Sequence, residues 1–146
     1  MTRTTHVAVA ITTSLAYSIL VSVQGVEVVA GAVCSCMIPD IDQKIKWLGH
    51  RRQTHSILFL AMFWLLWMLY PSGVTIGMIM GIWSHMAIDM LNSKGIELYY
   101  PFNTKNYSLC SLKYNGIGEK IIRYVSVGAS LGMIGLLGKN MIGGLI

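Results

Sequence analysis

Long apolar runs separated by short polar segments dominate this chain. Residues 7–26 contain no Asp, Glu, Lys or Arg, and neither do residues 56–88, where Pro71-Ser72-Gly73 provides the one turn signal. About 20 apolar residues are enough for a helix to cross a bilayer, so both runs predict membrane helices. Helices are expected at about 5–23, 55–70, 74–91 and 119–137, with Thr54 or Ser56 able to cap the second.

A shorter apolar run occupies residues 26–38 and stops at Pro39. Its helix would rise only about 20 Å, less than the roughly 30 Å hydrocarbon core. We therefore predict a short, tilted or re-entrant helix that returns the chain to the side where His6 lies. Residues 40–54 and 92–118 are expected to be polar connections. The predicted fold is an all-α, polytopic membrane bundle of four to five helices, forming a single domain over residues 1–146.

Small residues recur at helical spacing within two of the apolar runs. Such residues let membrane helices approach closely, and they predict packing surfaces rather than a function. The glycines in this pattern are Gly73, Gly77, Gly81, Gly128, Gly132, Gly135 and Gly138.

The composition supports a membrane protein. Apolar residues make up 54% of the chain and charged residues 12%, against roughly 25% charged residues in a soluble domain. A cleaved signal peptide at residues 1–32 is a weaker alternative, since the apolar run exceeds the usual length. Of the three cysteines, Cys34 and Cys36 could bind metal as a Cys-x-Cys pair, but packing within a helix is the better interpretation.

The net charge of +5 is best explained by membrane topology. Basic loops beside membrane helices set orientation, so nucleic-acid binding is not expected. In the predicted topology ten of the eleven basic residues lie on one face, which the positive-inside rule places in the cytoplasm. These are Arg3, Lys44, Lys46, Arg51, Arg52, Lys94, Lys105, Lys113, Lys120 and Arg123.

Every His and Asp of the chain falls on that same predicted face. His85 and Asp89 are spaced i, i+4 on a helix, so an imidazole and a carboxylate can share one metal ion. Asp40 and Asp42 would point the same way if their segment were extended. The candidates are His6, Asp40, Asp42, His50, His55, His85 and Asp89, more than the four ligands of one zinc ion. The surplus indicates two metals, or one metal with orienting groups and a general base.

These candidates receive separate roles. The expected ligands of a divalent metal, zinc first, are His6, Asp40, His55, His85 and Asp89. Asp42 and His50 are the candidate catalytic residues, either orienting a ligand or accepting a proton. Arg51 and Arg52 are candidate substrate-binding residues for a phosphate, although topogenic charge explains each of them equally well.

The order of these motifs resembles a known family. Residues 1–103 resemble the YdjM-like bacterial inner-membrane proteins. The motifs that carry the resemblance are, in order, His6, Pro39-Asp40-Ile41-Asp42, His50-Arg51-Arg52-Gln53-Thr54-His55-Ser56, Ser84-His85, Asp89, Gly95 and Tyr100-Pro101-Phe102. This chain has Arg52 where the family usually has Gly, and it has Ser93 close to a position where the family often has Thr. The resemblance implies a bacterial inner-membrane location and a metal-dependent hydrolase, distantly similar to zinc-dependent phospholipase C. It does not extend to residues 104–146.

The expected function is hydrolysis of a phosphoester, with a membrane lipid as one candidate carrier of that ester and with one or two zinc ions activating water. The main alternative is a membrane protein without enzymatic activity that binds or transports metal or supports another complex. Transport is disfavoured because the ionisable residues gather at one face. A haem protein with His axial ligands is a further alternative, but it would leave the three Asp without a role.

Overall fold

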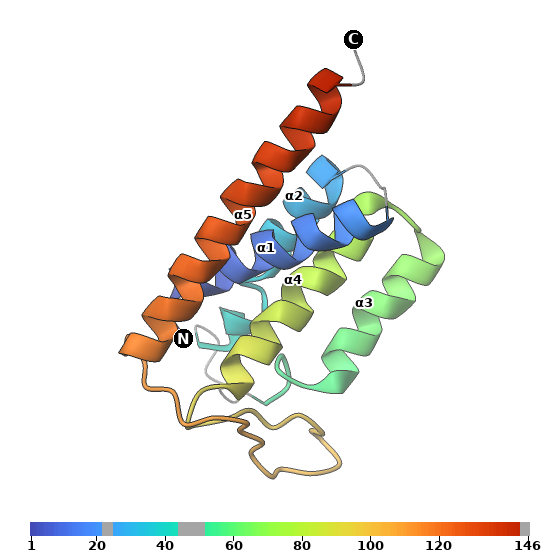
Figure 1. Ribbon diagram of the computed structural model, residues 1–146. Helices are drawn as coiled ribbons and strands as arrows, with labels where there is room; N and C mark the ends of the chain where they lie inside the picture. The colour runs from blue at the N-terminus through green and yellow to red at the C-terminus, as the bar shows by residue number, and fades with distance from the viewer. Residues whose placement is uncertain (22–24, 44–51, 144–146) are drawn as a thin grey trace.

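The chain folds into a bundle of helices (Figure 1). This computed structural model describes residues 1–21, 25–43 and 52–143. The elements in that part are α1 (Arg3–Val21), α2 (Gly25–Ser35), η1 (Pro39–Gln43), α3 (Ile57–Leu69), α4 (Gly73–Met90) and α5 (Ile117–Gly143). Extended pairing in these residues is confined to two isolated bridges, Asn92 with Leu112 and Ile96 with Tyr107. The predicted all-α fold is confirmed.

Side-chain caps start two of the helices. The hydroxyl of Ser56 accepts a hydrogen bond from the backbone N–H of Phe59 at 3.2 Å, so Ser56 is the N-cap of α3. Ser72 and Thr75 form a reciprocal capping box at the start of α4. Because capping satisfies N–H groups that have no partner within the helix, both helices begin at defined residues. The turn between them is the one predicted at Pro71-Ser72-Gly73.

The closest helix contact joins α2 to α4. A Cβ atom at Gly77 would collide with the carbonyl oxygen of Val28, and one at Gly81 would collide with that of Ala32. The two backbones can therefore approach closely only because these positions carry no side chain. The 11-residue α2 is the short helix predicted from the sequence, and it reverses the chain before η1.

Helix α1 lies between α2 and α5. Ala10 of α1 packs with Ala32 and Cys36 at the end of α2. On its other side, the hydroxyl of Thr12 hydrogen-bonds with the hydroxyl of Ser130 on α5 at 2.9 Å. Polar contacts of this kind and small side chains are common where membrane helices pack together.

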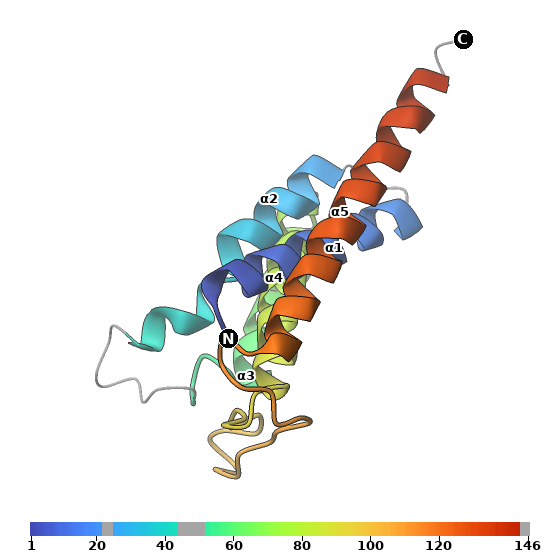
Figure 2. The ribbon, with the colours of Figure 1, turned by 60° about the vertical axis from the view of Figure 1, so that its left-hand side comes forward.

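Three glycines of α5 that were predicted to form a packing surface, Gly128, Gly132 and Gly135, have no packing partner among the described residues of this chain. Nothing in the described residues lies within 4 Å of a Cβ built at Gly128, Gly132 or Gly135. The reason is that α5 meets α1 through the face that carries Ser126 and Ser130. Figure 2 shows α5 running past the rest of the bundle toward the C-terminus.

Two helices are long and apolar enough to cross a membrane, judged by length and composition among the described residues. They are Arg3–Val21 and Ile117–Leu137. Helix α3 is also apolar but shorter, and it exposes Leu58, Met62 and Leu65. A multi-pass arrangement remains a prediction, although apolar side chains on an outer helix suit a lipid environment.

Candidate metal centre

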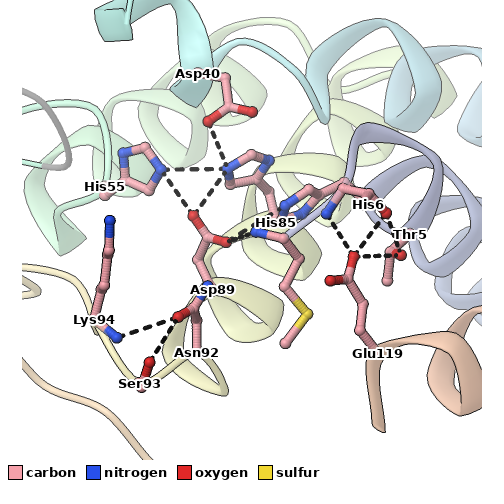
Figure 3. Close-up of polar contacts among 12 residues, drawn as sticks. Thr5, His6, Asp40, His55, His85, Asp89, Asn92, Ser93, Lys94 and Glu119 are labelled. Atoms are coloured by element: carbon pink, nitrogen blue, oxygen red, sulfur yellow. Dashed lines mark hydrogen bonds and ion pairs between the residues drawn. The ribbon is translucent and has the colours of Figure 1, made fainter. Parts of the chain in front are cut away.

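Four side chains from η1, α4 and the approach to α3 meet at one end of the bundle (Figure 3). They are Asp40, His55, His85 and Asp89, here called the cluster, and each offers a ligand atom within 4.8 Å of all the others. His55 and His85 are completely buried and Asp89 nearly so, while Asp40 is 17% exposed. Asp40 therefore stands at the solvent edge of the cluster.

The spacing of the ligand atoms fits a tetrahedral metal. Nε2 of His85 lies 3.3 Å from Nε2 of His55, 3.7 Å from Oδ1 of Asp40 and 3.7 Å from Oδ2 of Asp89. Nε2 of His55 lies 3.4 Å from Oδ2 of Asp89. Ligands placed tetrahedrally at about 2.1 Å from zinc are about 3.4 Å from one another. Four of the six separations are thus close to this value, and the two that join Asp40 to His55 and to Asp89 are within 4.8 Å, so the residues present can hold such an ion if Asp40 moves slightly inward.

The backbone at the end of α2 orients His85. Its Nδ1 lies 2.6 Å from the carbonyl oxygen of Cys36. A carbonyl only accepts hydrogen bonds, so Nδ1 carries the proton and Nε2 presents its lone pair to the cluster. The close contact between α2 and α4 holds donor and acceptor in register, which links the glycine pattern of α4 to the site.

Asp42 orients His55 in the same manner. Oδ2 of Asp42 lies 3.5 Å from Nδ1 of His55 and accepts a hydrogen bond of 3.1 Å from the hydroxyl of Thr54. Thr54 also donates to the carbonyl oxygen of Pro39 at 2.8 Å, which ties η1 to the chain before α3. A carboxylate behind a ligating imidazole sets its tautomer and raises its basicity.

The segment carrying Asp40 and Asp42 differs from the expectation. It is a 3₁₀ helix at Pro39–Gln43, whereas the two carboxylates were expected to share a direction on an extended segment. Successive residues of a 3₁₀ helix are 120° apart, so residues two apart diverge. Asp40 accordingly faces His85, while Asp42 faces the far side of His55.

The surroundings raise the pKa of His55 above its ordinary value. Burial opposes the charged imidazolium, but hydrogen bonds to Asp42 and Asp89 and the charges of both carboxylates outweigh it. With two carboxylates facing it, the imidazole of His55 is a strong acceptor for a proton.

His6 lies beside the cluster rather than within it. Its ring stacks on that of His85 with the centroids 3.9 Å apart and the planes inclined by 14°. Its Nε2 is 3.4 Å from Oδ1 of Asp89, and its buried Nδ1 has no hydrogen-bond partner. Asp89 thus directs Oδ2 to the cluster and Oδ1 to His6, and the backbone nitrogen of Met1 lies 2.9 Å from the same Oδ1.

The remaining site candidates are separate from the cluster or outside the described residues. Nε of Arg52 donates to Oε1 of Glu97 at 3.0 Å, and Arg52 is 53% exposed. His50 and Arg51 lie outside the described residues. Cys36 is buried against Ala10 and Ala32, which agrees with the packing interpretation, and Cys34 is exposed.

Sequence reasoning missed two carboxylates near the site. Glu97 pairs with Arg52 and keeps Oε2 buried without a partner. Glu119, at the start of α5, is buried and accepts from the hydroxyls of Thr2 and Thr5 at 2.7 and 2.9 Å. The chain has only six acidic residues, so an acidic side chain at the end of an apolar helix was the available signal.

Known proteins share this sequence pattern. The family model described as YdjM inner membrane protein matches residues 1–142. The inner membrane protein YdjM of Escherichia coli (strain K12) is 35% identical over 98 residues, covering 51% of this chain and 50% of that protein. The uncharacterized protein YvsG of Bacillus subtilis (strain 168) is 24% identical over 139 residues, covering 84% of this chain and 87% of that protein.

The match extends along nearly the whole of this chain, although the chain spans about half the length of the curated YdjM proteins of Escherichia coli and Shigella flexneri. No solved structure matches. The family model thereby reaches past residue 103, where the motif resemblance ended, and includes most of α5. This chain belongs to the YdjM family of inner membrane proteins.

Proposed function

We propose that the protein is a membrane-embedded, metal-dependent hydrolase acting on a phosphoester at the cytoplasmic face of the inner membrane. The observation that carries the proposal is the convergence of two imidazole nitrogens and two carboxylates at near-tetrahedral spacing in a buried position. Two neutral imidazoles and two carboxylates balance the charge of a divalent cation. A buried site without net charge avoids most of the cost of placing ions in a low-dielectric interior.

Each residue has a distinct task in this proposal. Asp40, His55, His85 and Asp89 hold the metal, while Asp42 and the Cys36 carbonyl orient the two imidazoles. A bound zinc ion supplies Lewis acidity and lowers the pKa of a water ligand toward 7. His6, stacked on His85 and facing Asp89, holds both groups in position. His50 remains the proposed proton acceptor.

The cytoplasmic placement rests on the basic residues. Arg3, Lys94 and Lys120 lie at or near the ends of α1, α4 and α5 that surround the cluster. The excess of Lys and Arg at this end favours the cytoplasm by the positive-inside rule.

A second candidate is a metal centre that only stabilises the fold. Its support is the number of ligands: four protein groups complete a tetrahedral zinc site, and structural sites are closed in this way. Catalysis requires one position to open to water, and Asp40 at the exposed edge is the ligand best placed to leave. The two candidates differ in whether metal-loaded protein turns over a phosphoester.

The first experiment measures metal content by plasma mass spectrometry on detergent-purified protein. Near-stoichiometric zinc is expected in the wild type and its loss in the His85→Ala, Asp89→Ala double variant. Ser84→Ala is the matched control, because Ser84 is equally buried on α4 but donates to the Gly81 carbonyl instead of joining the cluster. Wild-type protein that stays metal-free after reloading would overturn the metal centre.

The second experiment measures hydrolysis of bis(p-nitrophenyl) phosphate with and without zinc. The hydrolase predicts zinc-dependent turnover that disappears in Asp89→Ala and persists in Ser84→Ala. Bound zinc without turnover, together with a lower melting temperature after chelation, would instead support the structural centre.

A further inference from the structure

A pocket of about 310 Å³ adjoins the cluster on the side of α1 and α2. Its lining residues are Arg3, Cys34, Met37, Ile38, Asp40 and Ile41. Asp40 belongs both to this wall and to the cluster, where its Oδ1 lies 3.7 Å from Nε2 of His85. A molecule in the pocket therefore lies directly beside the position that a metal ion would take.

Among the described residues that line the pocket, Arg3 is the one with a cationic side chain. It stands at the start of α1, is exposed, and its guanidinium makes no hydrogen bond or ion pair within the described part of the chain. The other two described arginines are engaged, since Arg52 donates to Glu97 and Arg123 donates to Thr4. Arg3 is thus free to bind an external anion. From the sequence alone, Arg3 was expected only to help set the orientation in the membrane.

Apolar side chains on the rest of the pocket wall limit which kinds of ligand fit the pocket. Met37, Ile38 and Ile41 surround the pocket with apolar side chains, and Ile41 is 45% exposed. A small hydrated anion alone would leave this surface unused. A molecule with an anionic group and an apolar portion next to it would contact both kinds of wall.

We propose that this pocket binds the substrate of the proposed hydrolase, a phosphoester with an apolar substituent, through an ion pair between its phosphate and Arg3. The inference rests on the proposed function, because the cluster supplies the reacting position. The guanidinium can hold two phosphate oxygens at once, and Met37, Ile38 and Ile41 contact the apolar substituent. A phospholipid headgroup and a water-soluble aryl phosphoester share this chemistry.

A metal ion in the cluster should strengthen phosphate binding in the pocket. A divalent cation beside the pocket adds electrostatic attraction for a phosphate. Anion affinity should accordingly be higher in zinc-loaded than in zinc-free protein, while Arg3 supplies attraction in both states.

The test uses the full chain in detergent, with inorganic phosphate as the probe and isothermal titration calorimetry as the readout. We expect Arg3→Gln to weaken phosphate binding to zinc-loaded protein by about tenfold or more. Arg3→Lys should recover part of the affinity, since it keeps the charge but loses the fork geometry. Arg123→Gln is the control: it removes the same charge from a residue that contacts Thr4 outside the pocket.

Two arms distinguish the sources of the phosphoester. The first arm measures the KM for bis(p-nitrophenyl) phosphate, and the second measures the affinity for dihexanoyl phosphatidylglycerol. Each is measured for wild type and for Ile41→Asn. A lipid substrate predicts that Ile41→Asn weakens binding of the lipid while inorganic phosphate binds as before. A soluble aryl ester predicts a raised KM and unchanged lipid binding.

The zinc content of the same samples separates the two proposals. Wild-type protein that contains no zinc would contradict the proposed function. In that case, the affinities of wild type and Arg3→Gln for phosphatidylglycerol would still decide whether Arg3 binds an anion. Equal anion binding by wild type and Arg3→Gln, or an equal loss in Arg123→Gln, would overturn the pocket while leaving the metal centre intact.

Discussion

Nδ1 of His55 lies 3.5 Å from Oδ2 of Asp42, and this relationship turns the other ring nitrogen of His55 toward Asp89 and His85. Asp42 was a candidate catalytic residue on sequence grounds, yet it faces the side of His55 that is remote from the cluster. Its proposed task is to orient a ligand, as the Cys36 carbonyl does for His85.

The first prediction concerns Asp42→Asn. The amide can donate a hydrogen bond to Nδ1 and favour the tautomer that carries its proton on Nε2, which removes the lone pair needed by the metal. We expect zinc affinity to fall by about 10- to 100-fold, measured by competition with a chelator of known affinity. Thr54→Val removes the hydroxyl that contacts Asp42, the Pro39 carbonyl and Nδ1 of His55, but it keeps the Asp42 carboxylate behind His55 and should have a smaller effect. Wild-type zinc affinity in Asp42→Asn would contradict the orienting role.

The second prediction compares His6 with His85. His6 was expected to be a ligand, but it stacks against His85 and faces the outer oxygen of Asp89. His6→Phe keeps a flat ring for the stack, so we expect stoichiometric zinc with an affinity reduced by about tenfold. His85→Phe should lose bound zinc altogether. Plasma mass spectrometry of the two purified variants makes the comparison, and equal loss from both would restore His6 to the ligands.

The third prediction uses two glycines in different surroundings. Alanine at Gly77 would drive its Cβ into the carbonyl oxygen of Val28, whereas alanine at Gly132 would meet nothing within 4 Å. Gly77→Ala should therefore destabilise the fold by about 1–3 kcal/mol through overpacking. Gly132→Ala should be neutral or slightly stabilising because alanine favours the helix. Thermal unfolding in one detergent measures both, and equal melting temperatures would refute the close contact between α2 and α4.

The fourth prediction concerns the buried carboxylate that joins the ends of α1 and α5. Glu119 accepts hydrogen bonds from Thr2, Thr5 and the backbone N–H of Asn115. Glu119→Ala removes the acceptor that these donors share, and we expect a loss of about 1–3 kcal/mol in stability. Glu27→Ala is the comparison, because Glu27 lies in the first turn of α2, whereas the cluster is reached from the last turn of that helix through η1. Faster proteolysis between α4 and α5 in Glu119→Ala alone would support the role, and unchanged melting would refute it.

Local patterns accounted for most of the secondary structure. The apolar runs predicted α1, α3, α4 and α5, and Pro39 marked where the short helix must end. These features depend on hydrophobic length and on backbone breakers, which act over neighbouring residues. The conformation of Pro39–Gln43 was not recoverable in this way, because Thr54 and Asp42, distant in sequence from one another, hold it in place.

The sequence by itself determined that this is a helical membrane chain, and it predicted that its few His and Asp residues gather at one end. Apolar length and residue spacing are enough for both conclusions. Only the tertiary structure decided that Asp40, His55, His85 and Asp89 converge, that Asp42 and His6 stand behind them, and that Arg3 joins Asp40 in one pocket. Ligand distances depend on how α2, α4 and η1 pack, and helix packing is a property of residues far apart in the chain.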